Sequence, residues 1–142
     1  MTAQAFDHDY WQYTVPKVWT ERRPHWHCYL WQGDGVSWGR DCDRRSTLTD
    51  ITPLVVRDWL NKPAWTIKQA PEDPEAAVAW LKREYDKVTQ SIGQQATAIP
   101  EKTRFGIALY DLRAGNDLSW GFWVGTSTMW SAAVVGTDAK CH

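Results

Sequence analysis

Tryptophan dominates the apolar content of this chain and limits the folds that can accommodate it. The sequence holds eleven Trp, against five Tyr and three Phe. Each large aromatic side chain buries roughly 150 to 250 Å², so eleven of them offer more apolar surface than one small core normally takes. We therefore expect some Trp residues to line a groove or an interface. The alternative is that most lie in the core and the rest are half exposed on a sheet.

Length and composition predict one globular domain spanning residues 1–142. A chain of this size buries about 68% of the surface that it exposes when unfolded, which is enough for a single core. Hydrophobic residues make up 43% and charged residues 23%, as in ordinary soluble proteins. The formal net charge is −1, so no global field attracts nucleic acid or anionic lipid. Single-stranded nucleic-acid binding is therefore the weakest of three functional hypotheses.

The ends and the cysteines of the chain bear on where it acts. The first residues, "MTAQAFDHDYWQ", lack the basic and apolar regions of a secretory signal, and no apolar run is long enough to span a membrane. We therefore expect a cytoplasmic protein without a membrane partner. Cys28, Cys42 and Cys141 are too few for a disulfide framework, so we expect them to remain thiols.

Two segments have the pattern of helices. In "EDPEAAVAWLKREYDKV", Asp73 is the expected N-cap, Pro74 fits the first helical position and Gly93 offers a stop. A shorter helix is predicted in "TPLVVRDWLNKP", capped by Thr52 and ended by Pro63. The longer helix has one apolar stripe that should face the core: Ala77, Val78, Leu81, Tyr85, Val88 and Ile92, with Trp80 at its border.

The remaining apolar segments read as strands. The runs "RFGIALYDL", "LSWGFWVG" and "MWSAAVVG" predict a C-terminal three-stranded meander. Toward the N-terminus, "YWQYTV" and "AWTIKQ" are further candidates, and "HWHCYLWQ" with "VSWGRD" suggests a hairpin around the GDG turn. The expected fold class is α+β, with an antiparallel sheet and two helices packed on one face. The order of the strands is not specified by these patterns.

The predicted hairpin supplies a candidate binding surface. A type I′ turn at Asp34 and Gly35 would place Trp31 opposite Trp38, Tyr29 opposite Arg40 and His27 opposite Cys42. Such a platform would suit stacking on an aromatic or sugar group, with the guanidinium available for cation–π contact. Alternatively, the same face packs against the long helix as core. The candidate ligand-binding residues are Tyr29, Trp31, Trp38, Arg40 and Trp123, the last because Gly121 and Gly125 leave space beside its ring.

A metal site is the competing interpretation of this stretch. His25 and His27 have the spacing that puts two imidazoles on one side of a strand, and Cys42 offers a third ligand for zinc. The fourth ligand would be His8, Asp7, Asp9 or water. A lone pair of His residues at this spacing is weak evidence, and hydrogen-bonded sheet histidines are the simpler reading. We therefore favour neither zinc nor any other cofactor.

The sequence favours a binding module over an enzyme. It contains no GxSxG, P-loop or GxGxxG motif, and no catalytic residue is assigned. The leading hypothesis is a Trp-rich sheet face that binds a protein partner or a compact aromatic or polar ligand. The alternative is a small metal-dependent or thiol enzyme centred on His25, His27 and Cys42. The oligomeric state is left open.

Overall fold

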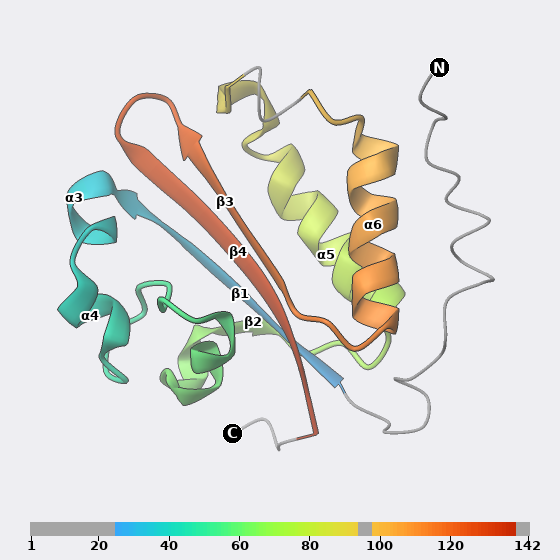
Figure 1. The fold of residues 1–142 in the computed structure, drawn as a ribbon, viewed down its shortest axis with the longest axis horizontal. Helices are drawn as coiled ribbons and strands as arrows, with labels where there is room; N and C mark the ends of the chain where they lie inside the picture. Colours follow the sequence, from blue (N-terminus) through green and yellow to red (C-terminus); the bar gives the residue numbers. More distant parts are fainter. Residues whose placement is uncertain (1–24, 94–97, 139–142) are drawn as a thin grey trace.

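A computed structural model describes residues 25–93 and 98–138 of the chain (Figure 1). One antiparallel sheet runs through it, with the strand order β2-β1-β4-β3. Its strands are β1 (His25–Asp34), β2 (Ile67–Gln69), β3 (Leu118–Val124) and β4 (Thr128–Thr137). Together with the helices described next, this sheet confirms the predicted α+β class.

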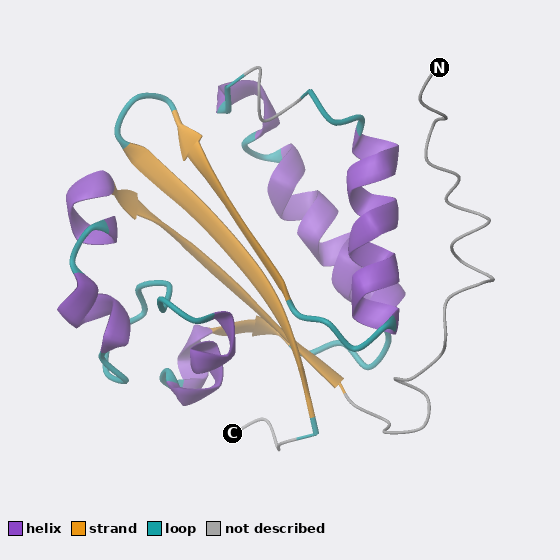
Figure 2. Ribbon diagram, in the orientation of Figure 1, coloured by secondary structure: helices purple, strands orange, loops and turns teal. Residues whose placement is uncertain are grey.

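Helical elements cover both faces of the sheet (Figures 1 and 2). On one face lie the two long helices, α5 (Pro74–Asp86) and α6 (Glu101–Arg113). The short 3-10 helix η3 (Thr89–Ser91) lies between them in the chain. The other face is covered by short elements between β1 and β2. These are α3 (Gly35–Trp38), α4 (Asp41–Arg45) and the 3-10 helices η1 (Val56–Asn61) and η2 (Ala64–Thr66).

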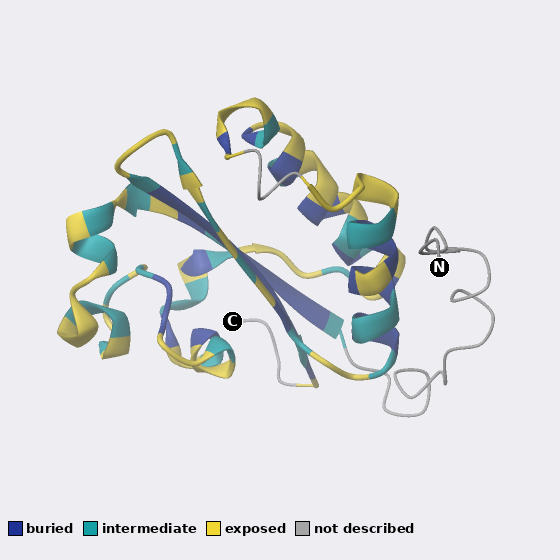
Figure 3. Ribbon diagram, turned by 45° about the horizontal axis from the view of Figure 1, so that its top comes forward, coloured by how far each residue is buried: buried dark blue, intermediate teal, exposed yellow. Residues whose placement is uncertain are grey.

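The pair formed by β1 and β4 is the centre of the molecule. The two strands pair along their whole length, from His25 opposite Thr137 to Asp34 opposite Thr128. Since successive side chains point to opposite faces, Trp26 and Cys28 enter the core under α5 and α6, whereas Tyr29 and Trp31 enter the core on the other face. Figure 3 shows the buried residues concentrated along these strands.

Helix α5 forms as its sequence pattern predicts. Asp73 is the N-cap, because its side chain accepts a hydrogen bond of 2.7 Å from the backbone N–H of Ala76, and Pro74 follows it. The helix ends at Asp86 rather than near Gly93. The predicted apolar stripe is buried, apart from the partly buried Val78: Ala77, Trp80, Leu81, Tyr85, Val88 and Ile92.

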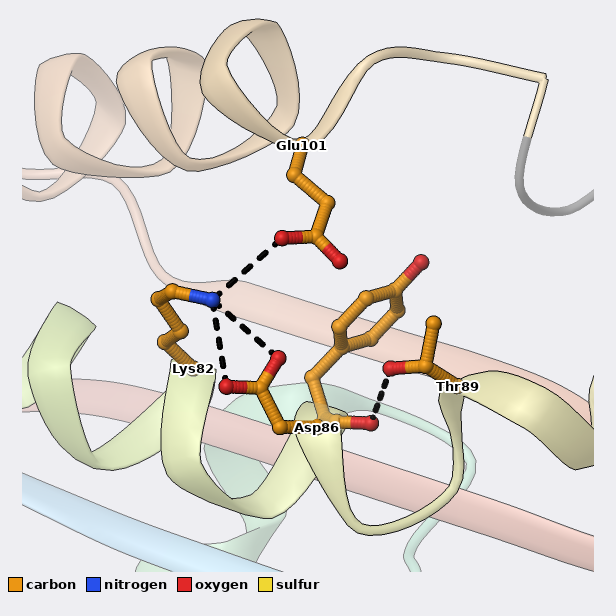
Figure 4. A network of polar contacts seen from close by, with 5 residues as sticks. Lys82, Asp86, Thr89 and Glu101 are labelled. Carbon is orange, nitrogen blue, oxygen red and sulfur yellow. Dashed lines mark hydrogen bonds and ion pairs between the residues drawn. The ribbon is translucent and has the colours of Figure 1, made fainter.

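Polar contacts connect α5 with the start of α6 (Figure 4). The Lys82 ammonium donates to both carboxylate oxygens of Asp86 at 3.1 Å and to Glu101 at 3.3 Å. These groups are about half exposed, so the ion pairs contribute little to stability. The buried stripes of the two helices, rather than these bridges, hold this layer to the sheet.

The predicted meander is wrong, because the segment "RFGIALYDL" belongs to α6. Its buried residues Phe105, Ala108, Leu109 and Leu112 recur at helical spacing. Ile107, which the strand pattern placed on one face with Phe105 and Leu109, is exposed. Pro100 precedes the helix, and Gly115, with a φ of 89°, follows its end. The other two segments do form the hairpin of β3 and β4, and the third neighbour is β1.

The remaining element predictions are partly met. The segment "AWTIKQ" contributes the three-residue strand β2. The predicted helix after Thr52 is the shorter 3-10 helix η1, which lies on the face opposite α5, and the buried Thr52 hydroxyl makes no capping bond. The two helices that share a face are therefore α5 and α6. The candidate strand "YWQYTV" lies outside the described residues.

The two described cysteines, both free thiols, should differ sharply in reactivity. Cys28 is fully buried, and loss of hydration raises the pKa of its thiol to about 12, whereas Cys42 is exposed. Because the thiolate is the reactive form, we expect iodoacetamide at mildly alkaline pH to label Cys42 quickly and Cys28 only after denaturation. Peptide mapping by mass spectrometry measures both rates, and equal native labelling would contradict this packing.

Candidate functional site

The predicted hairpin around the GDG turn is wrong, since β1 continues through Gly33 and Asp34 and pairs with β4. Asp34 is instead the N-cap of α3. Its carboxylate accepts hydrogen bonds from the backbone N–H of Ser37 at 2.7 Å and from the Ser37 hydroxyl at 3.0 Å. These bonds lower the pKa of Asp34. The residues expected to form the second strand therefore form α3 and the start of α4.

Two members of the predicted platform, Tyr29 and Trp31, lie in the core of the second face. Tyr29 is 1% exposed and stacks on Trp59, with ring centroids 4.6 Å apart. Trp31 is 8% exposed and its six-membered ring lies over Gly33, where it leaves no room for a Cβ. The shared face of these residues is thus as predicted, but it is covered by residues 35–66.

Trp38 completes a stack that reaches from this core to the surface. Its ring stacks on Trp31 at 5.8 Å, and the Arg44 guanidinium lies 3.9 Å from its centroid. Arg44 also donates to the backbone oxygen of Thr52 at 2.9 Å, which fixes the guanidinium in place. The guanidinium that lies on the Trp38 ring is that of Arg44, not that of Arg40, which was predicted to offer cation–π contact to a ligand. Arg40 is exposed and precedes α4 as its N-cap residue. Nothing in the sequence marked Arg44, rather than Arg40, as the residue that contacts the ring.

Trp123 is the most exposed of the predicted aromatic site residues, at 49%. Its ring lies against Gly35, where an added Cβ would come within 2.9 Å of Cη2. The space beside the ring therefore comes from the first residue of α3. A Cβ added at Gly121 would lie at an ordinary contact distance of 3.7 Å from the Met129 sulfur. Gly125 has a φ of 68°, a conformation that favours glycine. Nothing in the pattern of β3 indicated this contact across the sheet.

The candidate metal ligands are only partly brought together. His25 and His27 do share a face, with their Nε2 atoms 2.9 Å apart, and His27 Nδ1 lies 3.1 Å from the Tyr29 hydroxyl. The predicted pairing of His27 with Cys42 is wrong, because His27 opposes Val135 and Cys42 lies in α4. Among residues 25–93 and 98–138, no three His, Cys, Asp or Glu side chains are grouped to hold a metal. His8, Asp7 and Asp9 lie outside this range.

A buried ammonium holds the segment between α4 and η1 in place. Lys62 is 7% exposed, and its Nζ donates to the backbone oxygen of Ser46 at 2.7 Å and to the Thr49 hydroxyl at 3.0 Å. It also donates to the backbone oxygen of Asp43 at 3.3 Å. Desolvation lowers the pKa of this amine. Lys62 thereby links η1 to the loop that follows α4, a role that its surroundings in the sequence did not indicate.

Comparison with known protein families, with curated proteins and with solved structures found no match for this chain. In the part of the chain that the structure describes, no helix is both long and apolar enough to cross a membrane.

Replacing Asp34 tests the cap that displaced the hairpin. We expect Asp34→Ala to lower the free energy of unfolding and Asp34→Asn to retain most of it, because asparagine also caps helices. The folded-state pKa of Asp34 lies below its ordinary value of 3.8. The advantage of wild type over Asp34→Ala is therefore full above that value and is lost as the pH falls through the folded-state pKa. Thermal melts across this range measure it; equal melting of all three proteins at pH 7 would contradict the cap.

Trp31 and Trp123 should give opposite results on truncation. Trp31→Ala opens a cavity in the core of the second face and should cost about 3 to 5 kcal/mol. Trp123→Ala removes a half-exposed ring and should cost much less, while it removes fluorescence that acrylamide quenches. Chemical unfolding and quenching of the wild type and of both variants provide the measurements. Equal losses of stability would show that Trp123 is also core.

Proposed function

We propose that this chain is a small binding module that contacts another protein through an aromatic surface at α3. We call this the α3 surface and define it by Val36, Trp38 and Trp123. The observation that carries the proposal is the half-exposed Trp123 ring, which packs on Gly35 beside the 69%-exposed Val36. The proposal keeps the predicted role of Trp38 and Trp123 and moves the surface away from Tyr29 and Trp31.

The composition of the α3 surface suits a protein interface. Aromatic residues are enriched at the centres of such interfaces and often dominate their binding energy. Compact ligands, in contrast, usually bind in concave sites that bury most of their surface. Val36 and Trp123 project from a one-turn helix and from the outermost strand, an arrangement better matched to another protein's surface.

The α3 surface is also held rigidly before any partner arrives. Asp34 caps α3, and the backbone N–H of Gly35 donates to the backbone oxygen of Ser127 at 2.8 Å, which ties the helix to the turn between β3 and β4. Trp38 contacts both the Trp31 ring and the Arg44 guanidinium. Preorganised side chains lose less conformational entropy on binding, so more of the contact energy contributes to affinity.

We place this binding in the cytoplasm, as the sequence predicted. The free thiols of Cys28 and Cys42 are compatible with a reducing compartment. Neither thiol has a part in the proposed surface.

The experiment compares variants of the α3 surface with a matched variant elsewhere. Three full-length proteins are immobilised: the wild type, the double variant Val36→Asp with Trp123→Ser, and Trp65→Ser. The amounts of the proteins that each one retains are then compared. Trp65 is 64% exposed and lies in η2, so it controls for the loss of a surface Trp. We expect one protein to be retained by wild type and Trp65→Ser. Its affinity for the double variant, measured with purified components, should fall at least about 10-fold.

Unchanged melting of the double variant verifies that the fold is intact. Equal affinity for the wild type and the double variant would contradict the assignment of the α3 surface, as would an equal loss in Trp65→Ser.

A further inference from the structure

The Arg44 guanidinium belongs to α4 and contacts the α3 surface without an acidic partner. It lies 3.9 Å from the centroid of the Trp38 ring. No ion pair formed within residues 25–93 and 98–138 includes Arg44. A positive charge therefore lies against an aromatic ring of the α3 surface with no carboxylate in contact.

The hydrogen bonds of Arg44 leave part of its guanidinium unused. Nε donates to the backbone oxygen of Thr52 at 2.9 Å, and Nη1 and Nη2 donate to those of Trp38 and Pro53, each at 3.4 Å. A guanidinium carries one N–H on Nε and two N–H groups on each terminal nitrogen. In the described part of the chain, one N–H on Nη1 and one on Nη2 are therefore without an acceptor.

The surroundings of Arg44 favour an added negative charge. All three acceptors that it has are neutral backbone carbonyls. The side chain is only partly exposed, and burial lowers the pKa of Arg44. A charge that is removed from water is costly unless an opposite charge accompanies it. A carboxylate that reaches the remaining N–H groups would therefore relieve part of this cost.

The neighbouring charged side chains do not supply that carboxylate. Asp41 is exposed and favours the charged form of Arg44, but it lies beyond the distance of an ion pair. Asp43 instead accepts from Lys62 through its backbone oxygen. Burial, together with the nearby charge of Arg44, lowers the pKa of Lys62, so two cations lie close together here. Residues 40–45 hold three Arg and two Asp, which leaves an excess of positive charge.

We propose that the partner of the α3 surface presents an acidic side chain, whose carboxylate accepts hydrogen bonds from Arg44 beside the Trp38 ring. This inference rests on the proposed function, because it specifies the chemistry of the protein that the α3 surface would bind. The exposed Val36 and Trp123 supply the apolar part of the contact. Hydrogen bonds from a guanidinium to a carboxylate are about twice as strong as neutral ones.

A carboxylate matches Arg44 better than a phosphate does. The two remaining N–H groups equal in number the two oxygens of a carboxylate. A phosphate group brings three acceptor oxygens, and Arg44 has no further donor for the third. Because guanidinium groups also bind phosphate, phenyl phosphate is included as a competing probe.

The experiment uses 3-phenylpropionate, which joins a carboxylate to an apolar ring, and its neutral analogue 3-phenylpropionamide. Each is added to the full-length protein at constant ionic strength, and NMR follows the Nε–H signal of Arg44 and the indole N–H signal of Trp38. A ligand of this size should bind with a dissociation constant in the millimolar range. We expect the amide to bind at least about 10-fold more weakly than the acid.

Three variants separate Arg44 from positive charge in general. Arg44→Gln removes the charge and keeps an N–H donor for Thr52, whereas Arg45→Gln removes the charge of an exposed neighbour. Arg44→Gln should weaken the binding of 3-phenylpropionate at least about 10-fold, and Arg45→Gln should change it little. Asp41→Asn should tighten binding by about 2-fold, because it removes a negative charge that acts on Arg44.

Equal affinities for the acid and the amide would overturn the proposal, and this comparison needs no variant. So would equal losses in Arg44→Gln and Arg45→Gln, or binding of phenyl phosphate at least about 10-fold tighter than that of the acid. A protein that is retained through Val36 and Trp123 but binds both Arg variants equally would overturn the acidic contact and leave the α3 surface supported. Specific binding of the acid without any retained protein would instead contradict the proposed function.

Discussion

The backbone ladder between β1 and β4 is the interaction on which the rest of the molecule depends. Ten residues of each strand pair in one uninterrupted register, and both strands are largely buried on both faces. A shift by one residue would exchange the faces of Trp26 and Tyr29 and so disrupt both cores at once. The ladder also ends where Gly35 bonds Ser127, which determines the position at which α3 begins.

The tryptophan surplus is resolved by small residues placed opposite the large rings. Gly33 and Gly35 leave room for the rings of Trp31 and Trp123. In β4, the consecutive residues Ala132 and Ala133 place a small side chain on each face of the sheet, opposite Leu30 and Tyr29. Among the described Trp residues, the buried ones are Trp26, Trp31, Trp59, Trp80 and Trp130. Trp38 and Trp120 are half buried, and Trp65 and Trp123 remain exposed. Some of the set therefore reaches the surface, and the expectation that these rings line an interface stays a prediction.

The sequence predicted those elements whose signals were local and consistent. Asp73, Pro74 and the apolar stripe specified α5, and alternation specified β3. For α6, the same apolar residues satisfied both a strand and a helix pattern, and the deciding signals were Pro100 before it and Gly115 after it. At Asp34 and Gly35, a turn signal concealed an N-cap, because aspartate serves both and Ser37 lies at the capping distance. The face shared by Tyr29 and Trp31 was predictable from the strand period. Its cover was not, since residues 35–66 follow no single period.

The two layers that cover the sheet differ in how they are built, and this difference has a consequence for dynamics. One layer consists of two helices of thirteen residues each, with regular backbone bonds and long buried stripes. The other consists of short turns held to one another by individual side chains, chiefly Arg44 and Lys62. Segments with few repeated backbone bonds open at lower free energy than long helices and central strands. We therefore expect residues 41–66 to be the first cooperative unit to detach in native conditions, which would transiently uncover Tyr29 while α3, β1, β4 and the helical layer stay folded.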